Sequence, residues 1–506
     1  MLSRVQSFGL NGIEGYPVVV EANVSGGMPI FEIVGLPDAA VRESRERVRA
    51  AIANSGFKMP FTRVIINLAP ADTKKIGPMY DLPIALAVLC ASSQIPPEAL
   101  DGLLFVGELS MGGELAPIRG ALPIALSALT MGFAKLILPE KNAPELMSLS
   151  GLSVLGAKSL CMVIHHVTGK CFISPQAQKS YSEWEEDAGN PNDLSYIVGQ
   201  QTAKRALEIA AAGGHSLLMS GPPGSGKTML ARCLPSLLPA MTFEESLETT
   251  RIHSAAGTLT AGSGLMRARP FRAPHHTASL AALVGGGVDA HPGEITLAHN
   301  GVLFLDELPE FPRNVLDGLR QPLEDGAVTI VRAKSRSVFP ARAMLVASMN
   351  PCPCGYLGSP ARACRCSPQT IARYRGRISG PMLDRIDIRV EVGAVSAEDI
   401  ERGGASETSA EVRDRVLLAR QAQQKRYRGS GVFANAQCNA RQLLHFARLD
   451  ADATALLNGA VTRFGLSMRG RDRVRKVART IADLARSEAV RKEHVAEALQ
   501  YRGAEG

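Results

Sequence analysis

The 506-residue sequence lacks the features that mark membrane, secreted and disulfide-rich proteins. No stretch offers the roughly 18 uninterrupted apolar residues that a membrane-spanning helix needs. No long apolar segment follows the first methionine, so no secretory signal is evident, and we expect a cytoplasmic protein without a membrane partner. The nine cysteines are an odd number, which argues against a fully paired disulfide framework.

Aromatic residues are also scarce, at 5% of the chain, whereas basic residues are in excess and the formal net charge is +8. Residues 1–190 hold 15 basic and 18 acidic side chains, residues 191–395 hold 21 and 16, and residues 396–506 hold 20 and 14. This distribution favours a polyanionic partner for the last two-thirds of the chain, although a solvated basic surface would give the same counts. Few aromatics argue against stacking of single-stranded bases, so duplex DNA contacted along its backbone fits better.

A chain of this length usually forms two to four domains. We predict an α/β domain over residues 1–169, a linker over residues 170–192, an α/β core over residues 193–395 and a helical domain over residues 396–506. The linker is poor in apolar residues and contains Gly and Pro, and a second Gly/Ser/Glu-rich break precedes the helical domain.

The N-terminal domain alternates β-rich runs with helical periodicity. A helix is expected over residues 38–54 with Asp38 as its N-cap, and apolar spacing predicts further helices after Thr408. The predicted strands are Tyr16–Val24, Phe31–Val34, Arg63–Leu68, Leu103–Val106 and Lys135–Leu138.

One segment between a strand-like and a helix-like run fits the pattern G-x-x-x-x-G-K-[ST] at every position. Such a loop turns backbone N–H groups toward phosphate oxygens at a helix N-terminus. Its lysine can reach the β- and γ-phosphates, and its threonine can bind Mg²⁺. The residues are Gly221, Pro222, Pro223, Gly224, Ser225, Gly226, Lys227 and Thr228.

Polar residues follow three later apolar runs and complete a candidate ATP site. Asp306 and Glu307 end a continuous apolar run typical of a buried parallel strand, so Asp306 would hold Mg²⁺ and Glu307 would deprotonate the attacking water. Asn350 ends a third strand and could position the same water. Arg385 could stabilise phosphoryl charge across a subunit boundary, or could instead form a structural ion pair with Asp387.

This set resembles the Walker A, Walker B, sensor 1 and arginine-finger residues of AAA+ ATPases. More specifically, the chain resembles the ComM/YifB type of magnesium-chelatase-like AAA+ proteins. The resemblance implies a P-loop parallel-sheet core with a helical lid, and a hexameric ring with ATP and Mg²⁺ between subunits and Arg385 acting in trans. Arg469 lies where the family carries its sensor 2 arginine, although Gly470 and Arg471 replace an expected small-plus-aromatic pair. The adenine-side box is Val198, Gly199 and Gln200, and further likeness lies in Arg269–His276, Asn350–Gly355 and Val477–Asp483.

The N-terminal domain resembles the Lon-protease proteolytic domain, a fold like domain 2 of ribosomal protein S5. Residues 105–110 and 117–122 carry the likeness. Met79 stands in the stretch where Lon has its nucleophilic serine, and a thioether is not an acyl-transfer nucleophile. We therefore expect a domain without proteolytic activity.

Two basic inserts are candidate DNA contacts. Lys227 and Asp306 are 79 positions apart, and the excess length between them, residues 255–300, resembles the helix-2 insert of the chelatase branch. A second hairpin is expected over residues 326–342. In a ring both would face the channel and give salt-sensitive phosphate contacts, whereas the alternative is solvated loop tips. The candidate residues are Arg332, Lys334, Arg336, Arg267 and Arg269.

Four cysteines fall in two C-x-C pairs separated by nine residues. Four thiolates can bind a structural Zn²⁺ tetrahedrally, and the alternative is a thiol-rich turn beside Asn350. The residues are Cys352, Cys354, Cys364 and Cys366. The adjacent His275–His276 pair is expected to form hydrogen bonds or line a channel rather than bind metal.

The residues and the resemblance together predict an ATP-driven DNA motor that promotes branch migration of recombination intermediates during natural transformation. One alternative is a chelatase-type ATPase that remodels a protein partner. The other is an ATP-dependent protease, which Met79 disfavours.

Overall fold

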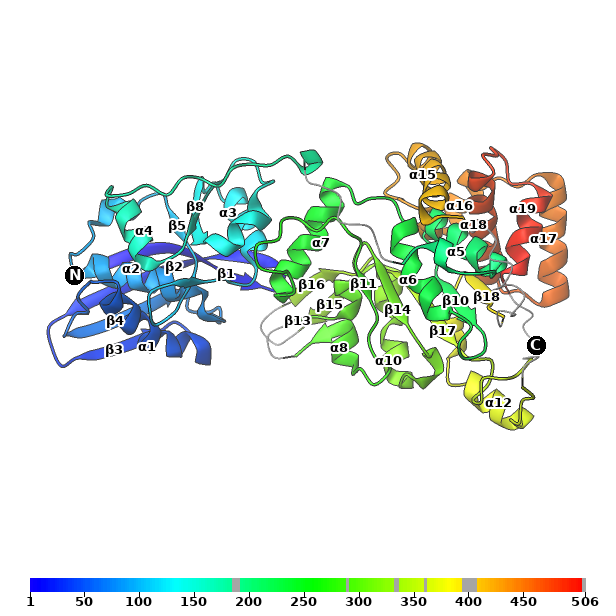
Figure 1. The fold of residues 1–506 in the computed structure, drawn as a ribbon, viewed down its shortest axis with the longest axis horizontal. Helices are drawn as coiled ribbons and strands as arrows, with labels where there is room; N and C mark the ends of the chain where they lie inside the picture. The colour runs from blue at the N-terminus through cyan, green and yellow to red at the C-terminus, as the bar shows by residue number, and fades with distance from the viewer. Residues whose placement is uncertain (184–191, 288–290, 332–335, 359–361, 394–406, 503–506) are drawn as a thin grey trace.

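The computed structural model describes residues 1–183, 192–287, 291–331, 336–358, 362–393 and 407–502. The molecule is elongated, with the N-terminal domain at one end, a second sheet in the middle and a helical domain at the other end (Figure 1). Among the described residues, no helix combines the length and apolar character needed to cross a membrane.

The N-terminal domain is built on a seven-stranded mixed sheet of order β3-β4-β2-β1-β5-β8-β9. The five predicted strands and the helix capped by Asp38, which accepts the Val41 N–H at 2.8 Å, are confirmed. The prediction omitted β1, which pairs antiparallel with β2 along its whole length. The strands are β1 (Leu2–Asn11), β2 (Glu14–Ser25), β3 (Ile30–Val34), β4 (Arg63–Ala69), β5 (Leu104–Phe105), β6 (Glu108–Leu109), β7 (Leu115–Ala116), β8 (Lys135–Pro139) and β9 (Ser153–Ala157), and the helices are α1 (Ala39–Asn54), α2 (Asp81–Ala91), α3 (Ala121–Thr130) and α4 (Leu160–Val167).

The middle of the molecule contains a five-stranded parallel sheet of order β11-β14-β17-β10-β18. Because all these strands run the same way, their carboxyl ends meet at one edge. The strands are β10 (Leu217–Ser220), β11 (Phe271–Arg272), β14 (Val302–Leu305), β17 (Met344–Met349) and β18 (Ile388–Glu391). Two hairpins lie outside the sheet, formed by β12 (Gly285–Gly286) with β13 (His291–Pro292) and by β15 (Ala327–Val331) with β16 (Arg336–Pro340).

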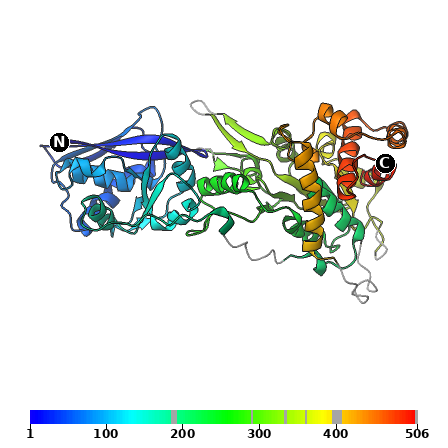
Figure 2. The same ribbon diagram turned by 90° about the horizontal axis from the view of Figure 1, so that it is seen from above.

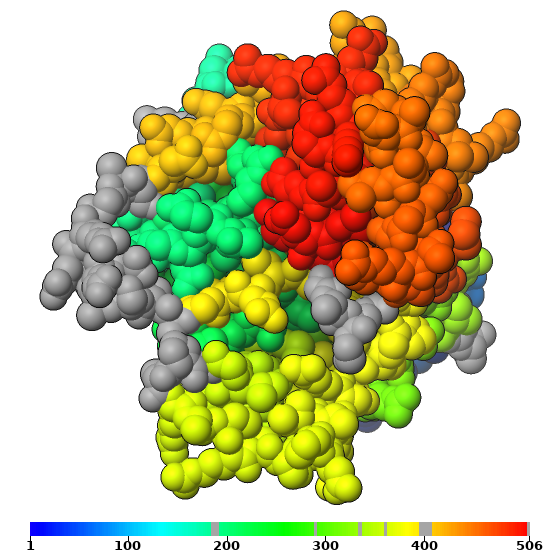
Figure 3. Space-filling view, turned by 90° about the vertical axis from the view of Figure 1, so that its right-hand side faces the viewer, coloured from blue at the N-terminus to red at the C-terminus, as the bar shows by residue number. Residues whose placement is uncertain are grey.

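Helices cover this parallel sheet and form the C-terminal domain, where α15 and α18 pack against α5. The C-terminal residues, orange to red in Figure 3, gather at this end of the molecule. His215, just before β10, lies 3.1 Å from Asp387 and 2.7 Å from Thr480 of α18, which joins the sheet to the helical domain. The helices are α5 (Gln201–Gly213), α6 (Lys227–Leu237), α7 (Phe243–Ala256), α8 (Leu280–Val284), α9 (Glu294–Leu297), α10 (Arg313–Gly318), α11 (Arg320–Asp325), α12 (Pro368–Arg375), α13 (Gly380–Leu383), α15 (Ser409–Arg426), α16 (Ala440–Phe446), α17 (Ala451–Phe464), α18 (Met468–Leu484) and α19 (Lys492–Gln500).

The two sheets are joined by direct contact as well as by the segment over residues 170–192, of which 184–191 lie outside the described residues. The turn between β1 and β2 lies at the side of the N-terminal domain that faces the second sheet (Figure 2). Ile13, in this turn, is buried in the same apolar cluster as Phe339 of β16. Arg251 of α7 donates to the Ile13 carbonyl at 2.7 Å, and the Ser254 carbonyl accepts the Gly120 N–H at 2.9 Å. The N-terminal domain therefore rests on the β15–β16 hairpin and on α7.

Candidate nucleotide-binding site

The loop between β10 and α6 has the backbone form that a phosphate cradle needs. Gly224 and Gly226 have φ values of 77° and 88°, a region that strongly favours glycine. A Cβ at Gly221 would lie 2.1 Å from the carbonyl oxygen of Val392, so only glycine fits beside the end of β18. Since α6 begins at Lys227, the first N–H groups of this helix face the loop.

Lys227 is buried and folds back over this loop. Its Nζ donates to the carbonyl oxygens of Gly221 at 2.7 Å and Pro222 at 2.8 Å, and to Oδ1 of Asn350 at 3.3 Å. Burial lowers the pKa of the ammonium group, and the charges of Asp306 and Glu307 oppose that change. Phosphate oxygens could take the place of these carbonyl and amide oxygens as hydrogen-bond acceptors, and they also carry negative charge. The ammonium group of Lys227 is therefore suited to bind a polyphosphate.

The carboxylates after β14 lie opposite the loop. Oδ2 of Asp306 accepts the Thr228 hydroxyl at 3.0 Å, which joins two oxygen donors suited to Mg²⁺. The N–H of Glu307 donates to Oδ1 of Asp306 at 3.1 Å and to the hydroxyl of Ser348 at 3.2 Å. The Ser348 hydroxyl also donates to Asp306. Sequence analysis missed Ser348, whose only signal was its place two residues before Asn350 on β17.

The predicted adenine-side residues lie against the same loop. Gln200 adopts a left-handed backbone with φ 57°, and its Nε2 donates to the carbonyl oxygens of Gly393 at 2.6 Å and Ser225 at 3.5 Å. The segment Val198–Gln200 thereby connects the phosphate loop to the end of β18.

Arg385 and Arg469 line one pocket of about 220 Å³, whose lining contains no residue of the phosphate loop. Arg385 pairs with Glu324 at 2.5 Å and donates to the Pro381 carbonyl at 2.7 Å. Asp387, the alternative partner considered for Arg385, is instead 3.1 Å from His215 and 3.4 Å from Arg473. Burial opposes its ionisation, but these basic neighbours hold the pKa of Asp387 below its usual value.

Comparison with known proteins identifies the family. Residues 193–400 match the family "Magnesium chelatase, subunit ChlI", residues 20–142 match "Subunit ChlI of Mg-chelatase", and residues 406–502 match "Magnesium chelatase, subunit ChlI C-terminal". The chain is 44% identical to the competence protein ComM of Haemophilus influenzae, over 99% of this chain and 97% of that protein. It is 43% identical to the uncharacterized protein YifB of Escherichia coli, with the same coverage.

The chain belongs to the ComM/YifB type of magnesium-chelatase-like proteins. ATPase activity, with ATP and Mg²⁺ as cofactors, follows from membership in this AAA+ family. An uncharacterized protein of Mycobacterium tuberculosis is 42% identical over 99% of this chain and 98% of its own length.

The predicted DNA-contact residues differ in their exposure and in their partners within the chain. Arg269 is 12% exposed and is held by Glu245 at 2.8 Å and by the carbonyl oxygens of Pro239 and Asn300. Arg267 donates to the Tyr181 carbonyl at 2.8 Å, with its guanidinium 4.6 Å from that ring's centroid. These contacts already engage both guanidinium groups within the chain, and their role as DNA contacts stays a prediction. Arg336 is exposed at the start of β16, while Arg332 and Lys334 lie outside the described residues.

The four predicted cysteines converge. Sγ of Cys352 lies 3.4 Å from that of Cys354 and 3.6 Å from that of Cys364. All four sulfur atoms lie within 4.8 Å of one another. Four thiolates at Zn–S bonds of about 2.3 Å would have sulfur atoms about 3.8 Å apart, so the cluster has the dimensions of a tetrahedral zinc site.

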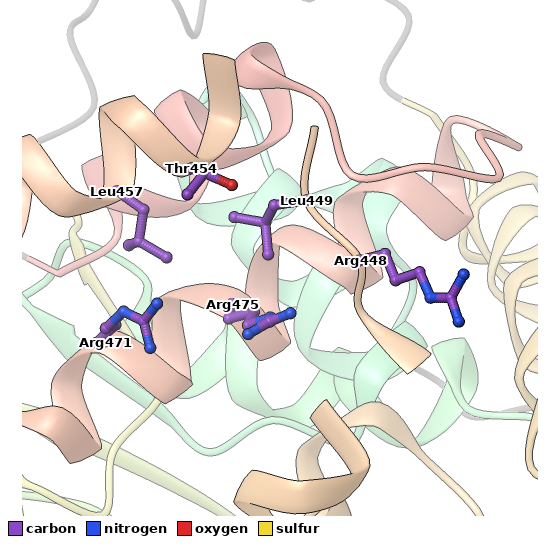
Figure 4. Close-up of a pocket in the computed structure, with 6 residues that line it drawn as sticks. All are labelled: Arg448, Leu449, Thr454, Leu457, Arg471 and Arg475. Carbon is purple, nitrogen blue, oxygen red and sulfur yellow. The ribbon is translucent and has the colours of Figure 1, made fainter. Parts of the chain in front are cut away.

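A second pocket, of about 340 Å³, lies in the helical domain (Figure 4). Arg471 lines this second pocket, whereas Arg469 lines the pocket that contains Arg385. Residues two positions apart on a helix point to nearly opposite sides, so of these two arginines α18 directs Arg469 toward the pocket of Arg385, which Arg473 also lines. The lining residues are Arg448, Leu449, Thr454, Leu457, Arg471 and Arg475.

Proposed function

We propose that this ATPase is a cytoplasmic DNA motor that drives branch migration of recombination intermediates during natural transformation. The observation that carries the proposal is the full-length similarity to a relative named a competence protein. It is found together with contacts of Lys227 with Asn350 and of Thr228 with Asp306 at the carboxyl ends of the parallel strands, which we call the ATPase edge. The basic excess of residues 191–506 supports a polyanionic partner.

We propose the following division of roles at the ATPase edge. The loop Gly221–Gly226 and Lys227 bind the phosphates, and Thr228 with Asp306 holds Mg²⁺, which when bound neutralises charge on the β- and γ-phosphates. Glu307 accepts a proton from the attacking water, and Asn350 orients that water. Lys227 already contacts Asn350, and Thr228 already contacts Asp306, beside the loop between β10 and α6.

The proposed assembly is a homo-oligomeric ring, most simply a hexamer. Arg385 and Arg469 share a pocket that includes no residue of the phosphate loop, so a nucleotide that they contact would be one bound by a neighbouring copy. To reach it, Arg385 would have to leave its ion pair with Glu324. Both arginines would then complete the site in trans, so hydrolysis would depend on assembly of the ring.

The DNA contacts of the proposed motor lie on the β15–β16 hairpin. Arg336 is exposed at its end, and Arg332 and Lys334 are the neighbouring basic residues. Contacts of this kind neutralise phosphates without reading bases, so binding should weaken steeply as salt rises. Arg336→Ala should lower both the affinity for DNA and the dependence of that affinity on salt concentration.

The proposal is tested by measuring ATPase activity with no DNA, linear duplex and four-way junction DNA, together with branch movement of a three-strand exchange intermediate. We expect stimulation by DNA and ATP-dependent branch movement in the wild type, and neither with Lys227→Ala. Equal ATPase rates in all conditions and a static branch point would refute the DNA motor and favour the protein-remodelling alternative.

We also propose that the cluster of Cys352, Cys354, Cys364 and Cys366 binds one structural Zn²⁺. The loop is next to the nucleotide site, because a Cβ at Gly355 would lie 2.5 Å from Cδ of Pro223. Elemental analysis should find one zinc per chain, lost in Cys364→Ser/Cys366→Ser and kept in Cys171→Ser, which alters an exposed cysteine elsewhere. Metal-free wild-type protein with four reactive thiols in this loop would refute the site.

A further inference from the structure

The pocket of about 340 Å³ in the helical domain has arginine on one side and apolar carbon on the other (Figure 4). In the part of the chain that the structure describes, three of its lining residues are arginines, none is acidic, and none belongs to the ATPase edge. They come from the first half of α18, from α17 and from the loop after α16. The roles proposed for ATP and DNA therefore leave this pocket unassigned.

Arg475 is the most buried of these arginines, with 7% of its surface exposed. Its Nε donates to the carbonyl oxygen of Ala447 at 2.8 Å, whereas its two terminal nitrogens make no hydrogen bond within the described ranges. No carboxylate within those ranges forms an ion pair with it. Burial, together with the charge of Arg471, lowers the pKa of this guanidinium, and Asp472 opposes that change. Because a buried cation without a counter-ion is costly, this position favours a bound anion.

Two further arginines add positive charge to the same pocket. Arg471 lies one turn before Arg475 on α18, is half-buried and, among the described residues, also has no ion pair. Like charges at this spacing repel each other, so an anion between the two side chains would turn repulsion into attraction. Arg448 is exposed at the rim, and in Figure 4 its side chain extends away from the other two. Rotation about its side-chain bonds can bring its guanidinium over the mouth of the pocket.

The opposite wall of the pocket is mainly apolar. Leu449 and Leu457 lie across from the arginines of α18 in Figure 4, and Leu457 is buried. The Thr454 hydroxyl donates to the Asp450 carbonyl at 2.8 Å, so its oxygen can still accept from a hydroxyl group of a ligand. The pocket thus offers cations for an anionic head group, and an apolar wall with one acceptor for a carbon body.

The charge and shape of the pocket favour a phosphate monoester. Such a group carries a charge of about −1.5 to −2 and three acceptor oxygens, which suit two guanidinium groups better than a single carboxylate does. An internal phosphate of duplex DNA carries one charge and is flanked by sugars, so it is poorly shaped to reach the buried Arg475. The lining, as far as the structure describes it, contains no aromatic side chain on which a base could stack. Its volume of about 340 Å³ lies at the lower end of small-molecule sites.

We propose that this pocket binds a small phosphate monoester with a short, hydroxyl-bearing carbon body. The phosphate lies between Arg471 and Arg475, and Arg448 closes over it from the rim. The carbon body packs against Leu449 and Leu457. Because the lining joins α17 to α18, the bound ligand stabilises the helical domain. The site is separate from the ATPase edge, so the inference stands whether or not the protein moves DNA.

The test is a calorimetric titration of the full chain carrying Lys227→Ala, which removes the lysine proposed to bind phosphates at the ATPase edge. The probes are ribose 5-phosphate, inorganic phosphate, succinate and a duplex DNA with phosphorylated ends. Arg471→Gln, added to this background, removes one guanidinium and leaves the bond from Arg475 to the Ala447 carbonyl in place. The matched control is Arg463→Gln, which alters an exposed arginine of α17 outside the pocket lining.

We expect one saturable site for ribose 5-phosphate, with affinity at least about tenfold weaker in Arg471→Gln and unchanged in Arg463→Gln. Arg448→Gln, at the exposed rim, should weaken binding about two- to fivefold. Succinate should bind at least about tenfold more weakly than the phosphate ester. Without ligand, all variants should melt at the temperature of the background protein, which shows that the helical domain is folded.

Several results would overturn the site. One is the absence of saturable binding of ribose 5-phosphate and inorganic phosphate below about 10 mM. Another is equal affinity in Arg471→Gln and Arg463→Gln, because the ligand would then bind elsewhere. Binding of the phosphorylated duplex alone would replace the small molecule by a DNA end, and a preference for succinate would replace the phosphate by a carboxylate. None of these results depends on stimulation of the ATPase by DNA.

Discussion

The N-terminal sheet and the parallel ATPase sheet each place a carboxylate among charged and hydroxyl groups, but they satisfy it differently. Asp81, at the start of α2, is fully buried and accepts from Arg47 at 2.7 and 3.1 Å, from the Leu109 N–H and from Ser44. Glu307 is 53% exposed and its carboxylate has the single 3.5 Å ion pair with His276 among the described residues. A carboxylate whose acceptor positions are filled stabilises a fold, whereas one left open is available for proton transfer.

The same contrast holds for Met79, which Sequence analysis compared with the nucleophilic serine of Lon. Met79 is buried in the apolar core of the N-terminal domain, and its carbonyl accepts the Gly107 N–H at 2.8 Å. At the ATPase edge the central polar residues instead face an open loop of glycines. The comparison predicts that the N-terminal domain responds to substitution through stability and the ATPase edge through rate.

Lys227→Ala should have the largest effect. Removing the ammonium group leaves the phosphates without their principal cationic contact, so kcat/KM for ATP should fall by roughly 10³-fold. ATPase assays and titration with a fluorescent nucleotide check this result. Turnover of Lys227→Ala within tenfold of the wild type would contradict the prediction that the ATPase edge responds to substitution through rate. An unchanged melting temperature serves as the folding control.

Glu307→Gln should lower kcat by about 10²–10³-fold and leave ATP affinity within a fewfold of the wild type. The amide keeps the size of the side chain but cannot accept a proton from water. Single-turnover kinetics and nucleotide binding measure the two quantities separately. Asp81→Asn, the matched change in the N-terminal domain, should leave kcat unaffected; a comparable fall in both variants would contradict the distinction.

Arg47→Ala should destabilise the N-terminal domain by about 3 kcal/mol without altering the ATPase rate, because it leaves the buried Asp81 carboxylate without its charged partner. Denaturant unfolding of the full chain, with limited proteolysis as the probe, measures this loss of stability. Arg45→Ala is the control, since Arg45 is exposed on the same helix and, in the part of the chain that the structure describes, forms its ion pair with its neighbour Glu46. Equal stability of the two variants would show that the buried pair contributes little.

The smallest expected effect concerns pH. The hydrogen bond from His299, together with the charges of His299 and Arg342, lowers the pKa of Glu248 to about 2 from an ordinary value near 4.5. Because the folded pKa lies below the unfolded one, this contribution is present above about pH 4.5 and is lost as pH falls toward 2. Unfolding measured between pH 5 and 3 should therefore show a shallower loss of stability in Glu248→Gln than in the wild type; parallel curves would contradict it.

Much of the fold could be predicted because its signals are local. Strand β4 is an alternating run, β14 is a continuous apolar run, and α1 begins at an N-cap whose carboxylate accepts the third following N–H. The first strand was missed although its buried positions alternate from Ser3 to Ser7, since serine and glycine weaken its apolar pattern. The completely buried helix α2 carried no amphipathic period and so gave no helical signal.

The site was predictable only in part. The phosphate loop is contiguous, so spacing alone identifies Gly221–Thr228 and their chemistry. Positive charge and the resemblance of residues 255–300 to a helix-2 insert suggested Arg267 and Arg269 as DNA contacts, and in the fold each is held by groups far away in the chain. A count of basic residues cannot distinguish a structural guanidinium from an exposed one, because that difference depends on which carbonyl and carboxylate oxygens the fold brings near.

By itself the sequence determined the phosphate loop, the paired carboxylates and the two C-x-C pairs, because each consists of residues close together along the chain. These motifs in turn indicated the family. Only the tertiary structure decided which of these groups meet. The parallel sheet brings Thr228 to Asp306 and His276 to Glu307, and α18 directs Arg469 toward the pocket of Arg385. The physical reason is that strands distant in sequence end at one edge, where their polar side chains find partners that no local pattern specifies.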